Sequence, residues 1–107
     1  MANALGYVTE TEDGFEGALA MLSLNANIRI VKNAEKTADT QPDFRVLAGE
    51  RGADIGGGWL RKAASSGREY VSLTLADPAI GPRKVYANLA PVKEKDGRHV
   101  ILWNPKN

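Results

Sequence analysis

The segment GGGWLRKAASSGREYVSLTL, residues 56–75, has the pattern of a β-hairpin. Small and polar residues from Ala64 to Gly67 are typical of a turn, and strand-forming residues lie on both sides of them. A loop of these four residues pairs Trp59 with Ser72 and Arg61 with Tyr70. Side chains alternate between the two faces of a strand. One predicted face therefore carries Leu60, Val71, Leu73 and Leu75. The other carries Trp59, Arg61, Tyr70, Ser72 and Thr74.

Similar short segments recur along the rest of the chain, separated by turn-forming residues. We predict further strands at Gly6–Glu10, Phe15–Leu24, Asn27–Lys32, Asp43–Ala48, Arg83–Leu89 and Arg98–Asn104. Residues 33–42 are polar and predict a surface loop, and residues 94–97 predict an exposed turn. This spacing is typical of an all-β fold, a single small antiparallel barrel or sandwich of about seven or eight short strands. The 107 residues fit one such domain.

The glycines at positions 56–58 raise the question of a phosphate-binding loop. Such a loop requires a lysine after its last glycine, where Trp59 stands, and a dinucleotide-binding motif requires a glycine where Arg61 stands. The favoured interpretation is a bulged strand, or one that a neighbouring backbone approaches closely, because only glycine fits there.

Residues for catalysis or metal binding are scarce. The chain has no cysteine and one histidine, His99, so thiolate and multi-histidine metal sites are excluded. No serine lies in a recognisable pattern with a base and an acid. We therefore expect a binding protein without enzymatic activity, cofactor or metal.

The charges are unevenly distributed, although the net charge is only +1. The first 20 residues contain Glu10, Glu12, Asp13 and Glu16 and no basic residue. In contrast, most of the charged residues between positions 59 and 92 are basic. This predicts an electrically two-sided molecule. The longest apolar run, 18–22, is too short for a membrane span or a signal peptide, so we expect a cytoplasmic protein that does not associate with membranes.

One face of the predicted hairpin combines aromatic and basic side chains. Proteins that bind single-stranded nucleic acid stack bases on aromatic rings and place cationic side chains along the phosphates. Trp59, Arg61, Arg68 and Tyr70 fit this description, and Lys84 and Tyr86 of a later strand extend it. Lys62 is a further candidate, although the register places it on the Leu60 side, from which it would have to reach around an edge.

Two interpretations of Trp59 remain open. The indole is either part of the core, with the glycines making room for it, or a surface for stacking bases. Trp103, between Leu102 and a nearby proline, is expected to pack at the end of the last strand.

Several segments together resemble one protein family. They are EDGFEG (12–17), PDFRV (42–46), IGGGW (55–59), SSGREYVSLTLADP (65–78), VYANL (85–89) and LW (102–103). The combination resembles the domain of unknown function 736 family of small proteobacterial proteins. The resemblance implies an association with plasmids, integrative elements and conjugation regions, and it assigns no catalytic residues. Family members often have alanine where this chain has Gly58.

These observations leave two functional hypotheses. The first is a non-enzymatic protein of mobile DNA that binds single-stranded nucleic acid through the aromatic and basic hairpin face. The second is a small protein-interaction module, a regulator or inhibitor, that uses an aromatic patch, a sheet edge or the acidic surface. Either a monomer or a homodimer is compatible with the exposed strand edges that we expect.

Overall fold

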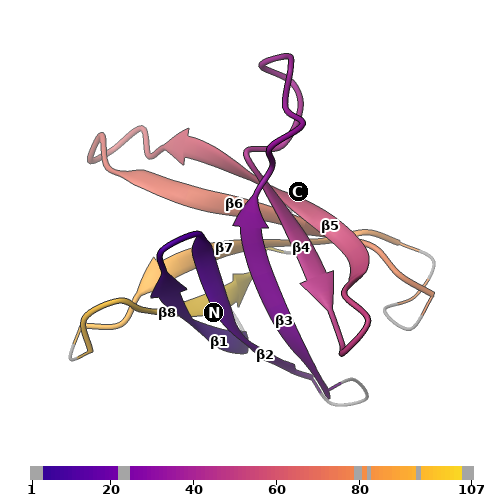
Figure 1. Ribbon diagram of the computed structural model, residues 1–107. Helices are drawn as coiled ribbons and strands as arrows, with labels where there is room; N and C mark the ends of the chain where they lie inside the picture. Colours follow the sequence, from indigo (N-terminus) through magenta and orange to yellow (C-terminus); the bar gives the residue numbers. More distant parts are fainter. Residues whose placement is uncertain (1–3, 22–24, 79–80, 82, 94, 105–107) are drawn as a thin grey trace.

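The computed structural model describes residues 4–21, 25–78, 81, 83–93 and 95–104. Within these residues eight antiparallel strands follow one another, and the pairing of the first with the last closes the sheet into a barrel (Figure 1). The strands are β1 (Ala4–Thr11), β2 (Gly14–Ala20), β3 (Asn25–Lys32), β4 (Phe44–Ala48), β5 (Ala53–Lys62), β6 (Glu69–Leu75), β7 (Val85–Pro91) and β8 (Arg98–Trp103). The prediction of an all-β fold is confirmed, and the barrel is adopted rather than the sandwich. No helix in the described part of the chain is long and apolar enough to span a bilayer.

The predicted register of the β5–β6 hairpin is confirmed. Trp59 pairs with Ser72, Leu60 with Val71, and Arg61 with Tyr70. The amide of Ala63 donates to the carbonyl of Arg68, which closes the turn on the four residues expected there.

The remaining strands agree with the predictions except at their ends. Residues 33–42 form the predicted loop between β3 and β4, and β2 ends at Ala20. The predicted continuation of that strand through residues 22–24 lies outside the described residues, as does Glu94 of the predicted turn.

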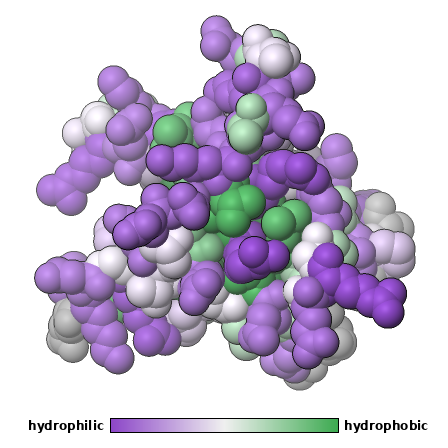
Figure 2. Space-filling view, viewed as in Figure 1, coloured by the Kyte–Doolittle hydropathy of each residue, from purple (hydrophilic) through white to green (hydrophobic). Residues whose placement is uncertain are grey.

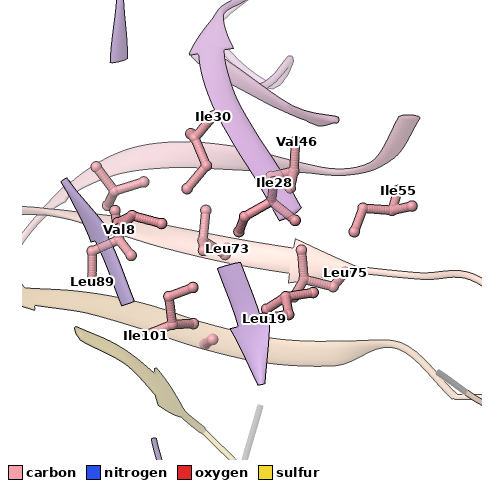
Figure 3. Close-up of a cluster of buried hydrophobic side chains, with 12 residues drawn as sticks. Val8, Leu19, Ile28, Ile30, Val46, Ile55, Leu73, Leu75, Leu89 and Ile101 are labelled. Atoms are coloured by element: carbon pink, nitrogen blue, oxygen red, sulfur yellow. The ribbon is translucent and has the colours of Figure 1, made fainter. Parts of the chain in front are cut away.

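Every strand contributes apolar side chains to one interior core (Figure 3). Removing these side chains from water is the main force that favours the closed barrel. The buried apolar residues in the described segments are Val8, Leu19, Ile28, Ile30, Val46, Ile55, Val71, Leu73, Leu75, Ala87, Leu89 and Ile101.

The tip of the β5–β6 hairpin extends beyond this core. Leu60 lies on the same face as Val71 but is 48% exposed. β7 pairs with β6 only along Ser72–Leu75, so the two strands diverge before they reach the tip of the hairpin (Figure 1). Consequently β7 does not cover the interior face of the hairpin beside Leu60.

The prediction of a bulge or a close approach at the three consecutive glycines is confirmed, because both features occur where this segment begins. The β4–β5 register shifts between Val46 and Leu47, so that Ile55 is an additional residue in β5. At the neighbouring Gly56, a Cβ atom would lie 1.9 Å from the carbonyl oxygen of Thr74. Any side chain at position 56 therefore requires β5 and β6 to move apart.

Two glycine-to-alanine substitutions should differ in their effect on stability. We expect Gly56→Ala to lower the free energy of unfolding by more than about 2 kcal/mol, because the clash is with backbone. Gly58→Ala should cost less than about 1 kcal/mol, because its Cβ would meet side-chain atoms of Leu73 and Val71 at 3.0 and 3.1 Å, and these can shift. Urea unfolding measures both values; equal losses would contradict this assignment of the close approach to position 56.

Candidate functional site

The outer surface of β5, β6 and β7 carries four of the seven residues predicted for binding, and two more directly precede β6 and β7. Strand pairing places Trp59 beside Ser72 and Arg61 beside Tyr70, while Tyr86 of β7 lies beside Thr74. Arg68 and Lys84 lie one residue before β6 and β7, and continuing the alternation of side chains by one residue assigns them to the sides of Tyr70 and Tyr86. We call Trp59, Arg61, Arg68, Tyr70, Lys84 and Tyr86 the aromatic-basic face.

Lys62 is not part of this face. It pairs with Glu69 and follows the interior side of the hairpin, on the same side as Leu60. Its neighbour Arg61 has a similar charge and exposure but lies on the outer side, so the two residues form a natural pair for comparison.

The core interpretation of Trp59 is wrong, because the side chain lies on the outer side of the barrel, and the stacking interpretation stays a prediction. The side chain is half-buried on the outside of the barrel, and its indole Nε1 donates to the carbonyl of Thr40 at 3.1 Å. A Cβ atom on Gly57 would lie 2.8 Å from Cβ of Pro42 and 3.3 Å from Cη2 of the indole. The absence of a side chain at Gly57 thus leaves room for both Pro42 and the indole over the strand.

The loop that holds Trp59 is itself ordered by hydrogen bonds. Asn33 Nδ2 donates to the carbonyl of Pro42 at 3.0 Å. The side-chain oxygen of Gln41 accepts from the amides of Thr37 and Ala38. Trp59 is therefore fixed in position before any ligand arrives, which lowers the entropic cost of binding.

Asp43 connects this loop to the hairpin. Its Oδ2 accepts from the amide of Leu60 at 2.8 Å, just before the point where β4 begins, and its Oδ1 pairs with Lys36. The hydrogen bond from Lys36, followed by that from the amide of Leu60, holds the pKa of Asp43 below its ordinary value of 3.8. The carboxylate thus accepts from an amide of β5 that lies past the first residue of β4 and has no β4 backbone partner.

The acidic β1–β2 hairpin has basic neighbours that the sequence order does not reveal. Glu16 pairs across the sheet with Arg29 of β3. On the other side Thr9 pairs with Arg98 of β8, whose guanidinium carbon lies 4.9 Å from the centre of the Tyr7 ring. The register thus places two arginines on strands that flank the acidic hairpin, and this proximity reduces the charge asymmetry that the sequence predicts.

Three large apolar side chains are exposed in the described part of the chain: Tyr7 at 46%, Leu60 at 48% and Trp103 at 39%. The prediction that Trp103 packs at the end of β8 is therefore only partly correct. The strand does end at Trp103, but 39% of this residue is exposed. On the face shown in Figure 2, the largest apolar area lies at the centre and is surrounded mainly by hydrophilic residues.

One end of the barrel contains an aromatic cluster that we did not predict. The Phe15 ring lies edge-on to Phe44, with centroids 6.2 Å apart, and edge-on to His99, with centroids 5.1 Å apart. The period of two along each strand identifies the interior face, but the contacts between these strands depend on barrel closure. His99 thus packs against a ring, and in the described segments no group of three or more potential metal ligands comes together.

The fold and the site define a class: a small closed antiparallel barrel with an aromatic-basic face on its outer surface. The model of a family described as protein of unknown function (DUF736) matches residues 4–106, and the chain belongs to this family. Comparisons with curated proteins and with solved structures give no match.

The contribution of Asp43 to stability should depend on pH. Because its pKa is lowered in the folded state, the contribution is present above the ordinary carboxyl pKa of about 4 and is lost as the pH falls through the lower, folded-state value. Asp43→Asn should cost about 1 kcal/mol at neutral pH, and the difference from the parent protein should vanish in acid. Urea unfolding over a range of pH tests this, with Asp39→Asn in the same loop as the control. A cost that persists unchanged in acid would contradict the assignment.

Proposed function

We propose that the protein binds single-stranded nucleic acid on the aromatic-basic face and that it is not an enzyme. The observation that carries the proposal is the register of β5, β6 and β7, which places Trp59, Arg61, Tyr70 and Tyr86 on one outer surface. Arg68 and Lys84 directly precede β6 and β7. Basic side chains next to stacking rings are what proteins that bind single strands without sequence preference require.

The three rings lie on three adjacent strands and at three levels of the sheet, because Tyr70 lies opposite Arg61, Trp59 opposite Ser72 and Tyr86 opposite Thr74. They are therefore staggered along the strands. The indole of Trp59 is held from the loop side by its hydrogen bond to the carbonyl of Thr40. Bases would stack on Trp59, Tyr70 and Tyr86. Arg61 and Arg68 at the tip of the hairpin and Lys84 before β7 would contact phosphates.

We further propose that this activity serves plasmids or integrative elements in the cytoplasm. The proposal rests on the association of the family with mobile DNA. Transfer and replication of such elements generate single strands, which are ligands for this kind of surface.

Titration of a fluorescent oligodeoxythymidylate tests the binding. In a Trp103→Phe background, emission reports Trp59 alone, because these are the two tryptophans of the chain. We expect saturable binding that quenches Trp59 and weakens with salt, because each neutralised phosphate releases counterions. Absence of binding at low salt would refute the proposal.

A matched pair of variants tests the location of the site. Arg61→Ala should weaken binding several-fold and reduce the slope of log affinity against log salt by about 0.7 to 1. Lys62→Ala removes the same charge from the opposite face and should have a clearly smaller effect. Equal losses would indicate general electrostatic attraction and would contradict a binding surface on the outer side of the hairpin.

A protein partner is the second candidate, and the exposed side chains of Tyr7, Leu60 and Trp103 favour it. The acidic residues Glu12, Asp13 and Glu16 would then meet a basic partner. Replacing these three residues by their amides separates the two candidates. Under the nucleic-acid proposal the change leaves binding of the oligonucleotide intact or strengthens it. Under the second candidate it abolishes binding of the basic protein partner.

A further inference from the structure

β6 is the central strand of the aromatic-basic face, with β5 on one side and β7 on the other (Figure 1). Beyond Tyr70 its outward side chains are those of Ser72 and Thr74, which are short and half-buried. Trp59 of β5 lies beside Ser72, and Tyr86 of β7 lies beside Thr74. The outer side of β6 is therefore a strip of short polar side chains with one larger aromatic side chain on each side of it.

Exposed basic side chains lie at both ends of this strip. Arg61 and Arg68 lie at the tip of the hairpin, where β6 begins. Lys84 directly precedes the residue of β7 that pairs with Leu75, the last residue of β6. The positive charges are thus separated along the direction of β6 and not across it.

A single strand on this surface has two alternative courses. Eight residue steps separate Arg68 from Ala76, which is level with Lys84 when the register is continued by one residue. A course along β6 therefore extends about 26 Å between the two basic ends. A course across β5, β6 and β7 covers two spacings between strands, about 10 Å, and reaches only one of these ends.

The stagger of the aromatic side chains favours the course along β6. Each of three successive cross-strand rows contains one ring, that of Tyr70, Trp59 or Tyr86. A strand that crosses the sheet follows one row and meets one ring, whereas a strand along β6 meets all three rings in succession. Stacking of successive bases on successive rings is how single-strand binders gain affinity without sequence preference.

We propose that the bound single strand lies along β6, between the indole of Trp59 and the ring of Tyr86, and extends from Arg68 to Lys84. The inference rests on the nucleic-acid binding proposed above and adds to it the course and the length of the ligand. A stacked strand advances about 3.4 Å per nucleotide and an extended one roughly twice as far. The 26 Å between the basic ends therefore corresponds to about four to eight nucleotides, within the site sizes of single-strand binding barrels.

The length of the ligand tests this course. Fluorescence anisotropy at low salt gives the affinity of the full chain for labelled oligodeoxythymidylates of about two to ten nucleotides. We expect the affinity to rise steeply up to about four to eight nucleotides and to change little beyond that length. A strand that crosses the sheet would reach full affinity at about three nucleotides, because the 10 Å course accommodates no more.

Variants at the two ends of the strip locate the strand. Arg68→Ala and Lys84→Ala should each weaken binding of the octanucleotide several-fold and reduce the slope of log affinity against log salt by about 0.7. Each should weaken binding of the trinucleotide by less than about twofold, because a ligand of this length cannot reach both ends and retains the other end. Lys93→Ala removes an exposed charge from the turn after β7, beyond the opposite end of that strand, and should leave both affinities unchanged.

The outcomes separate this inference from the proposed function. Full affinity at three nucleotides, with emission of Trp59 quenched in the Trp103→Phe background, overturns the course along β6 and leaves the binding surface intact. A Lys84→Ala variant that binds the octanucleotide as tightly as the parent protein also overturns it, because the strand then does not reach that end. Absence of binding at every length refutes the binding surface itself.

Discussion

The structure depends on points where two strands approach so closely that only glycine fits between them. At Gly56 a Cβ atom would lie 1.9 Å from the Thr74 carbonyl oxygen, and Gly6, Gly14 and Gly17 of the first hairpin have similarly close backbone neighbours. Closing eight short strands around one core requires sharp local bending, and bulges and glycines are the usual means. Here the bulge at Ile55 and the contact at Gly56 occur together, opposite Val46 of the core.

The next two glycines serve the two sides of the same strand. Gly58 faces the interior, where a Cβ atom would meet Leu73 and Val71. Gly57 faces outward and leaves room for Pro42 and the indole of Trp59. The segment that allows the barrel to close therefore also fixes the principal aromatic residue of the candidate site.

The candidate site is rigid where the loop holds it and open where the hairpin extends beyond the barrel. Asp43 joins the two parts, because it accepts from the amide of Leu60 and pairs with Lys36 of the loop. Beyond this point β6 loses β7 as a neighbour, and Arg61 and Tyr70 stand on a two-stranded projection. A rigid aromatic anchor beside an accessible basic projection is compatible with an extended and flexible ligand such as a single strand.

The sequence alone determined the all-β class, the register of the β5–β6 hairpin and the assignment of Arg61 and Lys62 to opposite faces, because these depend on a local period of two and on turn residues. It could not determine barrel closure, the exposure of Leu60, or the position of Arg29 and Arg98 on the strands that flank the acidic hairpin. Each of these depends on which strands become neighbours and where their pairing ends, which sequence spacing does not encode. The position of Trp59 was decided in the same way: its hydrogen bond to Thr40 spans 19 residues and forms only once the loop has folded back onto β5.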